Sequence, residues 1–273
     1  MRTIDCIPYN GESIVLFRLA YLWDVIDEFI VVEAAETHVG RPKDFLYLER
    51  DAALFEPYRS KMTRLIIDRF PEPSAEQLET LGQRGFITDT RVWHREVFQR
   101  NYAAQRLREI ATPWILFCCD ADEIPRREAV SALREHYGAL DDPHRLEMHL
   151  FYYSSDWIKS SKWYHAFVVN DRGFQRESLD DMRVGTHVKK FVHDAGWHLS
   201  YFMTQEEIQR KVSSMAHTEF NTAENRAIDW IRHCQQTGLD LYHRGGVEDC
   251  TRYTGDDLPA GLREFELKHG IRR

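Results

Sequence analysis

Short, continuous apolar runs alternate along the chain with longer segments in which apolar residues recur every three or four positions. Residues 29–32 (Phe-Ile-Val-Val) and 114–119 (Trp-Ile-Leu-Phe-Cys-Cys) are typical of strands covered on both faces of a sheet. Strands are also expected near residues 5–8 and 62–67, and helices over 12–23, 91–110 and 126–137. This alternation predicts an α/β fold with a mostly parallel central sheet and helices on both faces.

Residues 146–203 have a different pattern, rich in aromatic residues and in polar–apolar alternation. It indicates antiparallel strands added to one edge of the sheet or laid over its ligand-binding face. Helices are expected over 205–215 and 223–236, followed by a loop and a short terminal helix over 253–273. We therefore expect one domain over residues 1–220 and a C-terminal helical extension over 221–273.

Charge and cysteine content narrow the class of protein. The 44 acidic residues outnumber the 36 basic ones, giving a net charge of -8. That excess argues against a general nucleic-acid binder, which neutralises phosphates with Lys and Arg. The five cysteines show no metal-ligand spacing, and Cys118 and Cys119 lie in an apolar run, as expected in a reducing compartment. With no signal peptide and no apolar run near the roughly 18 residues of a membrane span, we expect a cytoplasmic protein; peripheral membrane contact stays open.

An acidic cluster, Asp120-Ala121-Asp122-Glu123, directly follows the second buried run. Ligands of α/β sheets bind outside the carboxyl ends of the strands, so both aspartates are placed to face a ligand. Carboxylate oxygens suit hard divalent cations such as Mg²⁺ and Mn²⁺. The same residues together with Pro125 are also typical of an ordinary helix N-terminus, with an acidic N-cap and a proline near the first helical position.

Several short motifs occur in the order found in glycosyltransferase family 17, which this chain resembles over roughly residues 5–220. They are Asp5–Glu12, Trp23–Ala34, Thr37 with Gly40–Lys43, Glu96 with Gln99–Asn101, Asp120–Pro125 and Gly196–Ser200. The resemblance implies a Rossmann-like GT-A fold, an inverting mechanism, a UDP-sugar donor (UDP-N-acetylglucosamine in the best-known members) and a divalent metal. It would make residues 1–125 the donor-binding part and 126–220 the acceptor and metal part. Animal members carry a Golgi membrane anchor, so a bacterial-style glycan or glycolipid is the expected acceptor.

Within that resemblance, Asp122 is the expected metal ligand and Asp120 binds either the donor ribose or metal-bound water. His198, in Gly196-Trp197-His198, is the expected third ligand; an ordinary strand histidine is an equal alternative. His217 is the second choice for this ligand.

Six residues are expected to contact the nucleotide, five of them besides Asp120. Glu33, at the end of the second strand, is expected to accept from the uracil imide, although a carboxylate that caps the following turn would look the same. Tyr9 and Asn10 would border the base, yet turn formation also explains Asn10 before a glycine. Arg100 and, more weakly, Lys43 would reach the diphosphate, since guanidinium groups match phosphate oxygens; a solvated helix arginine is the alternative for Arg100.

The general base that an inverting transfer needs is not fixed by the sequence. Asp156, beside Trp157 on the expected acceptor side, and Glu123 are the candidates. Two other functions stay open: a nucleotidyltransferase on a similar fold, which usually has a glycine-rich phosphate loop absent here, and a non-catalytic carbohydrate-binding protein that uses the aromatic region.

Overall fold

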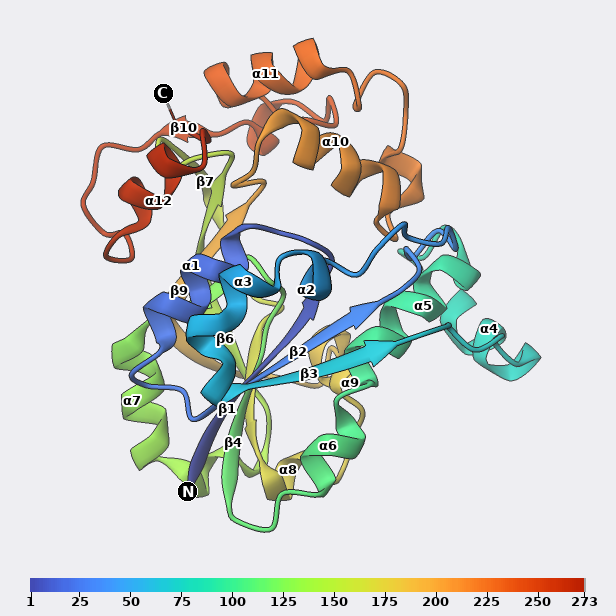
Figure 1. The fold of residues 1–273 in the computed structure, drawn as a ribbon, viewed down its shortest axis with the longest axis vertical. Helices are drawn as coiled ribbons and strands as arrows, with labels where there is room; N and C mark the ends of the chain where they lie inside the picture. The colour runs from blue at the N-terminus through green and yellow to red at the C-terminus, as the bar shows by residue number, and fades with distance from the viewer. Residues whose placement is uncertain (273) are drawn as a thin grey trace.

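The computed structural model describes residues 1–272, and it has the mixed α/β architecture that the sequence predicts. Four parallel strands lie in the order β4-β1-β2-β3 at one side of the sheet (Figure 1). Their bounds are β1 (Arg2–Tyr9), β2 (Glu28–Ala34), β3 (Met62–Ile67) and β4 (Trp114–Cys118). Every residue of β2 and β4 is buried, which confirms that these apolar runs are strands covered on both faces.

The aromatic region extends this sheet beyond β4 with antiparallel strands, as expected. The strand order continues β4-β8-β6-β7-β10, and β6 also pairs with β9 in parallel. The bounds are β6 (His144–Tyr152), β7 (Trp157–Trp163), β8 (Phe167–Asn170), β9 (Lys190–Ser200) and β10 (Thr251–Arg252). The sheet therefore has a parallel half from the first part of the chain and a largely antiparallel half from the second.

Helices cover both faces of the sheet, and each face packs against its helices through a separate apolar cluster. On one face lie α1 (Ile14–Leu22), α2 (Tyr47–Arg50), α3 (Ala52–Phe55), α7 (Arg127–Glu135) and α12 (Leu262–Lys268). On the other lie α5 (Thr90–Asn101), α6 (Ala104–Arg108), α8 (Asp171–Phe174) and α9 (Leu179–Val184), with α4 (Ala75–Gly82) against α5. None of the helices in the described part of the chain is long and apolar enough to cross a membrane.

Two local features differ from the sequence predictions. The single helix expected over 91–110 is two helices, α5 and α6, separated by Tyr102 and Ala103, whose backbone angles remain helical. The acidic cluster does not run straight into a helix, because Glu123–Pro125 forms a short strand, β5, paired with β9. A side chain at Gly196 would meet the Ile124 carbonyl oxygen, so the lack of one there permits this close pairing.

Two helices lie together at one end of the molecule, α10 (Gln205–Ser214) and α11 (Ile228–Thr237) (Figure 1). Both were expected from the sequence, α11 a few residues earlier than it begins. Ile208 and Val212 of α10 share an apolar cluster with Ile231 and Cys234 of α11 and with Tyr153 after β6. This cluster holds α10 in place, and α10 forms one wall of the pocket described below. The boundary at residue 220 between a domain and an extension stays a prediction.

Candidate active site

The segments that follow β1, β2 and β4 meet at the carboxyl ends of neighbouring parallel strands. Tyr9 to Glu12 follow β1, and Asp120 to Glu123 follow β4. Gly11 adopts a φ of +89°, and a Cβ at this position would lie 2.6 Å from the Tyr47 ring. The glycine therefore allows a tight turn directly against the loop that follows β2. Sheets of this kind bind their ligands at this edge.

The carboxylates of Asp120 and Glu123 are held by buried arginines. Asp120 Oδ1 accepts from Arg100 at 2.7 Å, and Oδ2 accepts from Arg183 at 2.5 Å. Arg183 also donates to both oxygens of Glu123, at 2.8 and 2.9 Å, and Glu123 accepts from the Trp163 indole and the Asp120 backbone N–H. Burial opposes ionisation of Asp120 and Glu123, but the arginine charges outweigh it and lower the pKa of both carboxyl groups.

Asp122 has a separate set of partners. Lys211 Nζ lies 2.8 Å from its Oδ2, and His198 Nε2 lies 3.4 Å from its Oδ1. Burial disfavours the charged form, yet Lys211 and His198 outweigh that effect and hold the pKa of Asp122 well below its usual range. Asp122 is thus an ionised carboxylate between a lysine and a histidine.

Asp122 and His198 fit a divalent metal as two of its ligands. Ligand atoms about 2.0–2.2 Å from one ion lie roughly 3 Å apart, which compares with the 3.4 Å between Asp122 Oδ1 and His198 Nε2. The other ring nitrogen of His198, Nδ1, is buried without a hydrogen-bond partner in residues 1–272. Asp120 does not complete the set, because both its oxygens are bound to arginines.

A pocket of about 300 Å³ opens at this edge of the sheet, between the turn after β1, the loop after β2 and one side of α10. Four cationic side chains line it, from two opposite walls: Arg41 and Lys43 from the loop, Arg210 and Lys211 from α10. Its carboxylates are Glu12, Asp44 and Glu207, and its aromatic side chains are Phe45 and Tyr47. Within the described residues, Arg41 and Arg210 form no ion pair, so their charges are available to an anionic ligand.

Of the residues expected to contact a nucleotide, Asn10 and Lys43 line this pocket. Tyr9 lies just beneath it, packed edge-on against Tyr47 and Phe55.

Glu33 lies behind the pocket wall. Its oxygens accept from the backbone N–H groups of Tyr47 and Leu48, and from Lys43 at 3.4 Å. The structure thus contains the turn-capping arrangement that was the alternative for Glu33.

Arg100 is also buried and faces Asp120 and Glu96 rather than the pocket. The solvated surface position that was its alternative is excluded by this burial. The diphosphate contact expected of Arg100 stays a prediction, and its partners favour an indirect role through Asp120.

The two candidate bases are not pocket residues in this structure. Glu123 is fully buried, with both oxygens engaged. Asp156 follows β6 and forms an ion pair with Arg272 at 3.0 Å, and its backbone oxygen accepts from Tyr253. His217, the second-choice metal ligand, pairs with Glu219 and packs against Trp93, apart from Asp122.

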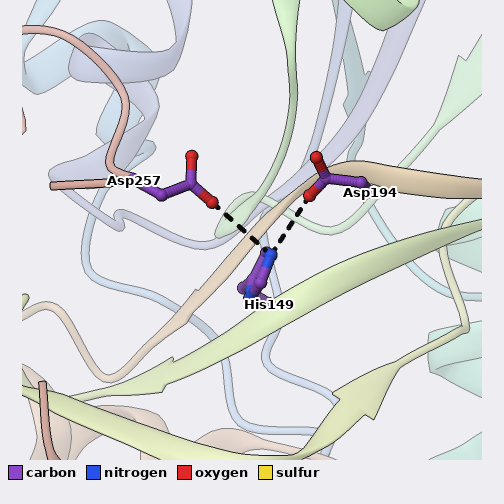
Figure 2. A group of neighbouring side chains, drawn as sticks. All are labelled: His149, Asp194 and Asp257. Atoms are coloured by element: carbon purple, nitrogen blue, oxygen red, sulfur yellow. Dashed lines mark hydrogen bonds and ion pairs between the residues drawn. The ribbon is translucent and has the colours of Figure 1, made fainter. Parts of the chain in front are cut away.

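A second group of potential metal ligands, His149, Asp194 and Asp257, lies elsewhere on the surface (Figure 2). The His149 ring lies 3.1 Å from Asp194 and 3.5 Å from Asp257. Arg126 already binds both carboxylates, at 2.8 and 2.6 Å. Protein cations therefore compensate the two negative charges. We interpret this group as an ion-pair cluster that links the segment around Asp257 to β6 and β9.

Three residues whose contacts with the acidic cluster were not found from the sequence are Arg183, Lys211 and Trp163. Each lies more than 35 residues from the acidic cluster that it contacts, within a segment that looks like an ordinary helix or strand end. A pattern confined to neighbouring residues has no means of indicating such contacts.

Comparison with known proteins assigns the family. The family model for glycosyltransferase family 17 matches residues 1–243. The rat and human β-1,4-mannosyl-glycoprotein 4-β-N-acetylglucosaminyltransferases are each 27% identical to this chain over 267 residues, covering 87% of the chain and 48% of the relative. The chain thus spans about half the length of these relatives.

Among solved structures, a 4-diphosphocytidyl-2C-methyl-D-erythritol synthase from Anaerococcus prevotii matches with a TM-score of 0.34 and 12% identity, covering 71% of this chain and 89% of that one. A similarity this low does not indicate a shared function. The match of the family model over nearly nine-tenths of the chain decides the matter, and the chain belongs to glycosyltransferase family 17.

Proposed function

We propose that this protein transfers N-acetylglucosamine, with inversion, from a UDP-linked donor to a hydroxyl group of a glycan or glycolipid. The observation that carries the proposal is the pocket at the carboxyl ends of β1 and β2, with four cationic side chains on its walls and Asp122 beside Lys211. Family membership and the names of the relatives support the reaction class and the sugar. The expected cytoplasmic location stays a prediction.

The cations suit a nucleoside diphosphate. The two phosphate groups of such a ligand are negatively charged. Arg41 and Lys43 would bind them from the loop after β2, and Arg210 and Lys211 would bind them from α10. Burial lowers the pKa of Lys43, although Glu33 counteracts this by favouring its charged form. The exposed Phe45 ring and the Tyr47 ring, 5.3 Å apart, offer the base an apolar surface, with Tyr9 supporting Tyr47 from below.

Asp122 and His198 would hold a divalent metal, Mn²⁺ or Mg²⁺, which neutralises charge on the departing nucleoside diphosphate. Asp120, whose carboxylate is held by Arg100 and Arg183, would orient the donor ribose or a water bound to the metal. Glu123 fixes the Asp120 backbone N–H and Arg183, so it shapes the segment that carries Asp122.

The acceptor hydroxyl must lose a proton as its oxygen attacks the anomeric carbon. Among the carboxylates that line the pocket, Glu207 accepts from the Thr204 backbone N–H and Asp44 is exposed on the loop. Glu12 accepts from the Asn10 backbone N–H at 2.7 Å, and burial raises its pKa. A raised pKa brings a carboxylate closer to the range of an effective base. We therefore place Glu12 beside Asp156 and Glu123 as a candidate base, and favour it.

Thermal unfolding with UDP and UDP-N-acetylglucosamine, each with and without Mn²⁺, tests the proposal. At about 100 times Kd a ligand stabilises the folded state by roughly 2.7 kcal/mol. For a chain of this size that is a Tm shift of about 5–10 °C. A shift that requires nucleotide and metal together supports the donor and metal assignments. No shift at saturating UDP with metal would contradict them, and a shift with CTP instead would favour a nucleotidyltransferase.

A further inference from the structure

Asp122 pairs with the ammonium group of Lys211 in this structure and would also be a ligand of the proposed metal. In the structure Lys211 Nζ lies 2.8 Å from Asp122 Oδ2, while His198 faces Oδ1. The proposed metal would need the same carboxylate. An ammonium group and a divalent ion in contact with one carboxylate repel each other strongly when all three are shielded from water.

We propose that Lys211 is an exchangeable counter-ion of Asp122, which it leaves for the donor diphosphate so that the metal can bind. The exchange moves a charged group between two partners and breaks no covalent bond. The inference rests on the proposed function, because it takes the diphosphate and the metal as the two ligands.

The position of Lys211 allows both contacts. Its side chain lines the pocket together with Arg210 and Ser214 of the same helix, so it borders the space that the diphosphate would fill. About a quarter of the side chain is exposed, which leaves room for the ammonium group to turn away from Asp122. Four rotatable bonds make such a movement possible without displacement of α10.

Two properties of binding follow. Without nucleotide, the metal must compete with Lys211 and binds weakly. With nucleotide, phosphate oxygens receive Lys211 and Asp122 becomes available, so nucleotide and metal strengthen each other's binding by the same factor.

The test measures Mn²⁺ binding directly, from the electron paramagnetic resonance signal of free Mn²⁺, in wild type and in Lys211→Met without nucleotide. We expect Mn²⁺ to bind about tenfold more tightly to Lys211→Met, because the competing cation is gone. Arg210→Met is the matched control: it removes one positive charge from the same pocket and helix but no contact with Asp122. We expect its Mn²⁺ affinity to stay near that of wild type.

A second measurement uses UDP. In wild type, UDP should increase Mn²⁺ affinity about tenfold, and in Lys211→Met this increase should largely disappear. Without UDP, equal Mn²⁺ affinity of wild type and Lys211→Met would overturn the exchange. So would an increase in nucleotide-free Mn²⁺ affinity that is the same in Lys211→Met and Arg210→Met. If Lys211→Met does not fold, tight Mn²⁺ binding to wild type without UDP overturns it just as well. Absence of UDP binding to wild type would instead contradict the proposed donor, and the nucleotide-free Mn²⁺ comparison distinguishes the two failures.

Discussion

Arg18 binds both carboxylate oxygens of Asp5, at 2.6 and 2.7 Å, and both side chains are fully shielded from solvent. The same guanidinium donates to the backbone oxygens of Asp120 and Glu123, at 2.6 and 2.7 Å. A single residue of α1 therefore joins the first strand to the segment that carries the acidic cluster. Burial raises the pKa of Asp5, although Arg18 counteracts it.

Replacing Arg18 by Met should destabilise the fold strongly. Loss of Arg18 leaves a buried, unpaired Asp5 charge and removes one hydrogen bond from each of two backbone carbonyl oxygens, a cost of about 3–5 kcal/mol. The Tm should fall by roughly 10 °C. Arg134→Met is the control, since Arg134 forms an exposed pair with Asp27 at 3.6 Å. Equal small shifts for both variants in thermal unfolding would contradict the role of Arg18.

Asp122→Ala should nearly abolish transfer while the fold survives. The variant loses the proposed metal ligand, and Lys211, which is partly exposed, can turn toward the pocket. We expect kcat to fall by about 100-fold or more. UDP release in the presence of acceptor measures activity, circular dichroism reports the fold, and Asp24→Ala on the surface is the control. Full activity in a folded Asp122→Ala protein would remove Asp122 from the mechanism.

Comparison of Glu12→Gln with Asp156→Asn decides between two candidate bases. Glutamine retains an oxygen for the Asn10 backbone N–H, so the turn after β1 should persist. Loss of a general base lowers kcat by roughly 100-fold or more, with KM much less affected. We expect this for Glu12→Gln, whereas Asp156→Asn should leave kcat nearly unchanged because Asp156 pairs with Arg272. The reverse result would assign the base to Asp156.

Asp240→Asn should weaken the C-terminal region in a pH-dependent way. Burial opposes ionisation of Asp240, but hydrogen bonds and charge from Arg244 outweigh it and lower its pKa below the usual 3.8. The carboxylate therefore stabilises the fold above about pH 4, and this contribution is lost as the pH falls through the lowered pKa. Urea unfolding should show a gap between wild type and Asp240→Asn at pH 7 that narrows at pH 3.5.

If that gap stays constant with pH, the Asp240 charge does not contribute as described. If Asp240→Asn unfolds in two steps, residues 221–273 unfold separately from the rest, which would support the boundary that the sequence predicts at residue 220.

The elements of the parallel half were predictable because their signals are local. The run Phe29-Ile30-Val31-Val32 can be buried on both faces only as a strand inside a sheet, and β2 has this position. The helix expected over 205–215 follows from its apolar spacing and begins with a capping box at Thr204 and Glu207. The place of the acidic cluster at the end of β4 followed from the same reasoning.

The partners of the acidic cluster were not predictable, because they come from distant parts of the chain. Arg183 reaches Asp120 and Glu123 from α9, and Lys211 reaches Asp122 from α10. Arg and Lys on helices are usually solvated, so their residue type carried no signal. The sequence offers Arg100 only as a candidate for a diphosphate contact, and its burial against Asp120 depends on how α5 packs, which the sequence pattern does not fix.

The pairing of β5 with β9 affects the order in which parts of the protein fold during synthesis. Leu199 donates its backbone N–H to the Asp122 carbonyl at 2.8 Å, and His198 lies opposite Glu123 in the strand pair. Contacts across some 75 residues of intervening chain form late, since a large loop must close first. During synthesis, the first 150 residues can assemble the parallel strands but not the finished acidic cluster. If Asp122 and His198 hold a metal as proposed, a ribosome-bound nascent chain should bind none until β9 has emerged from the exit tunnel.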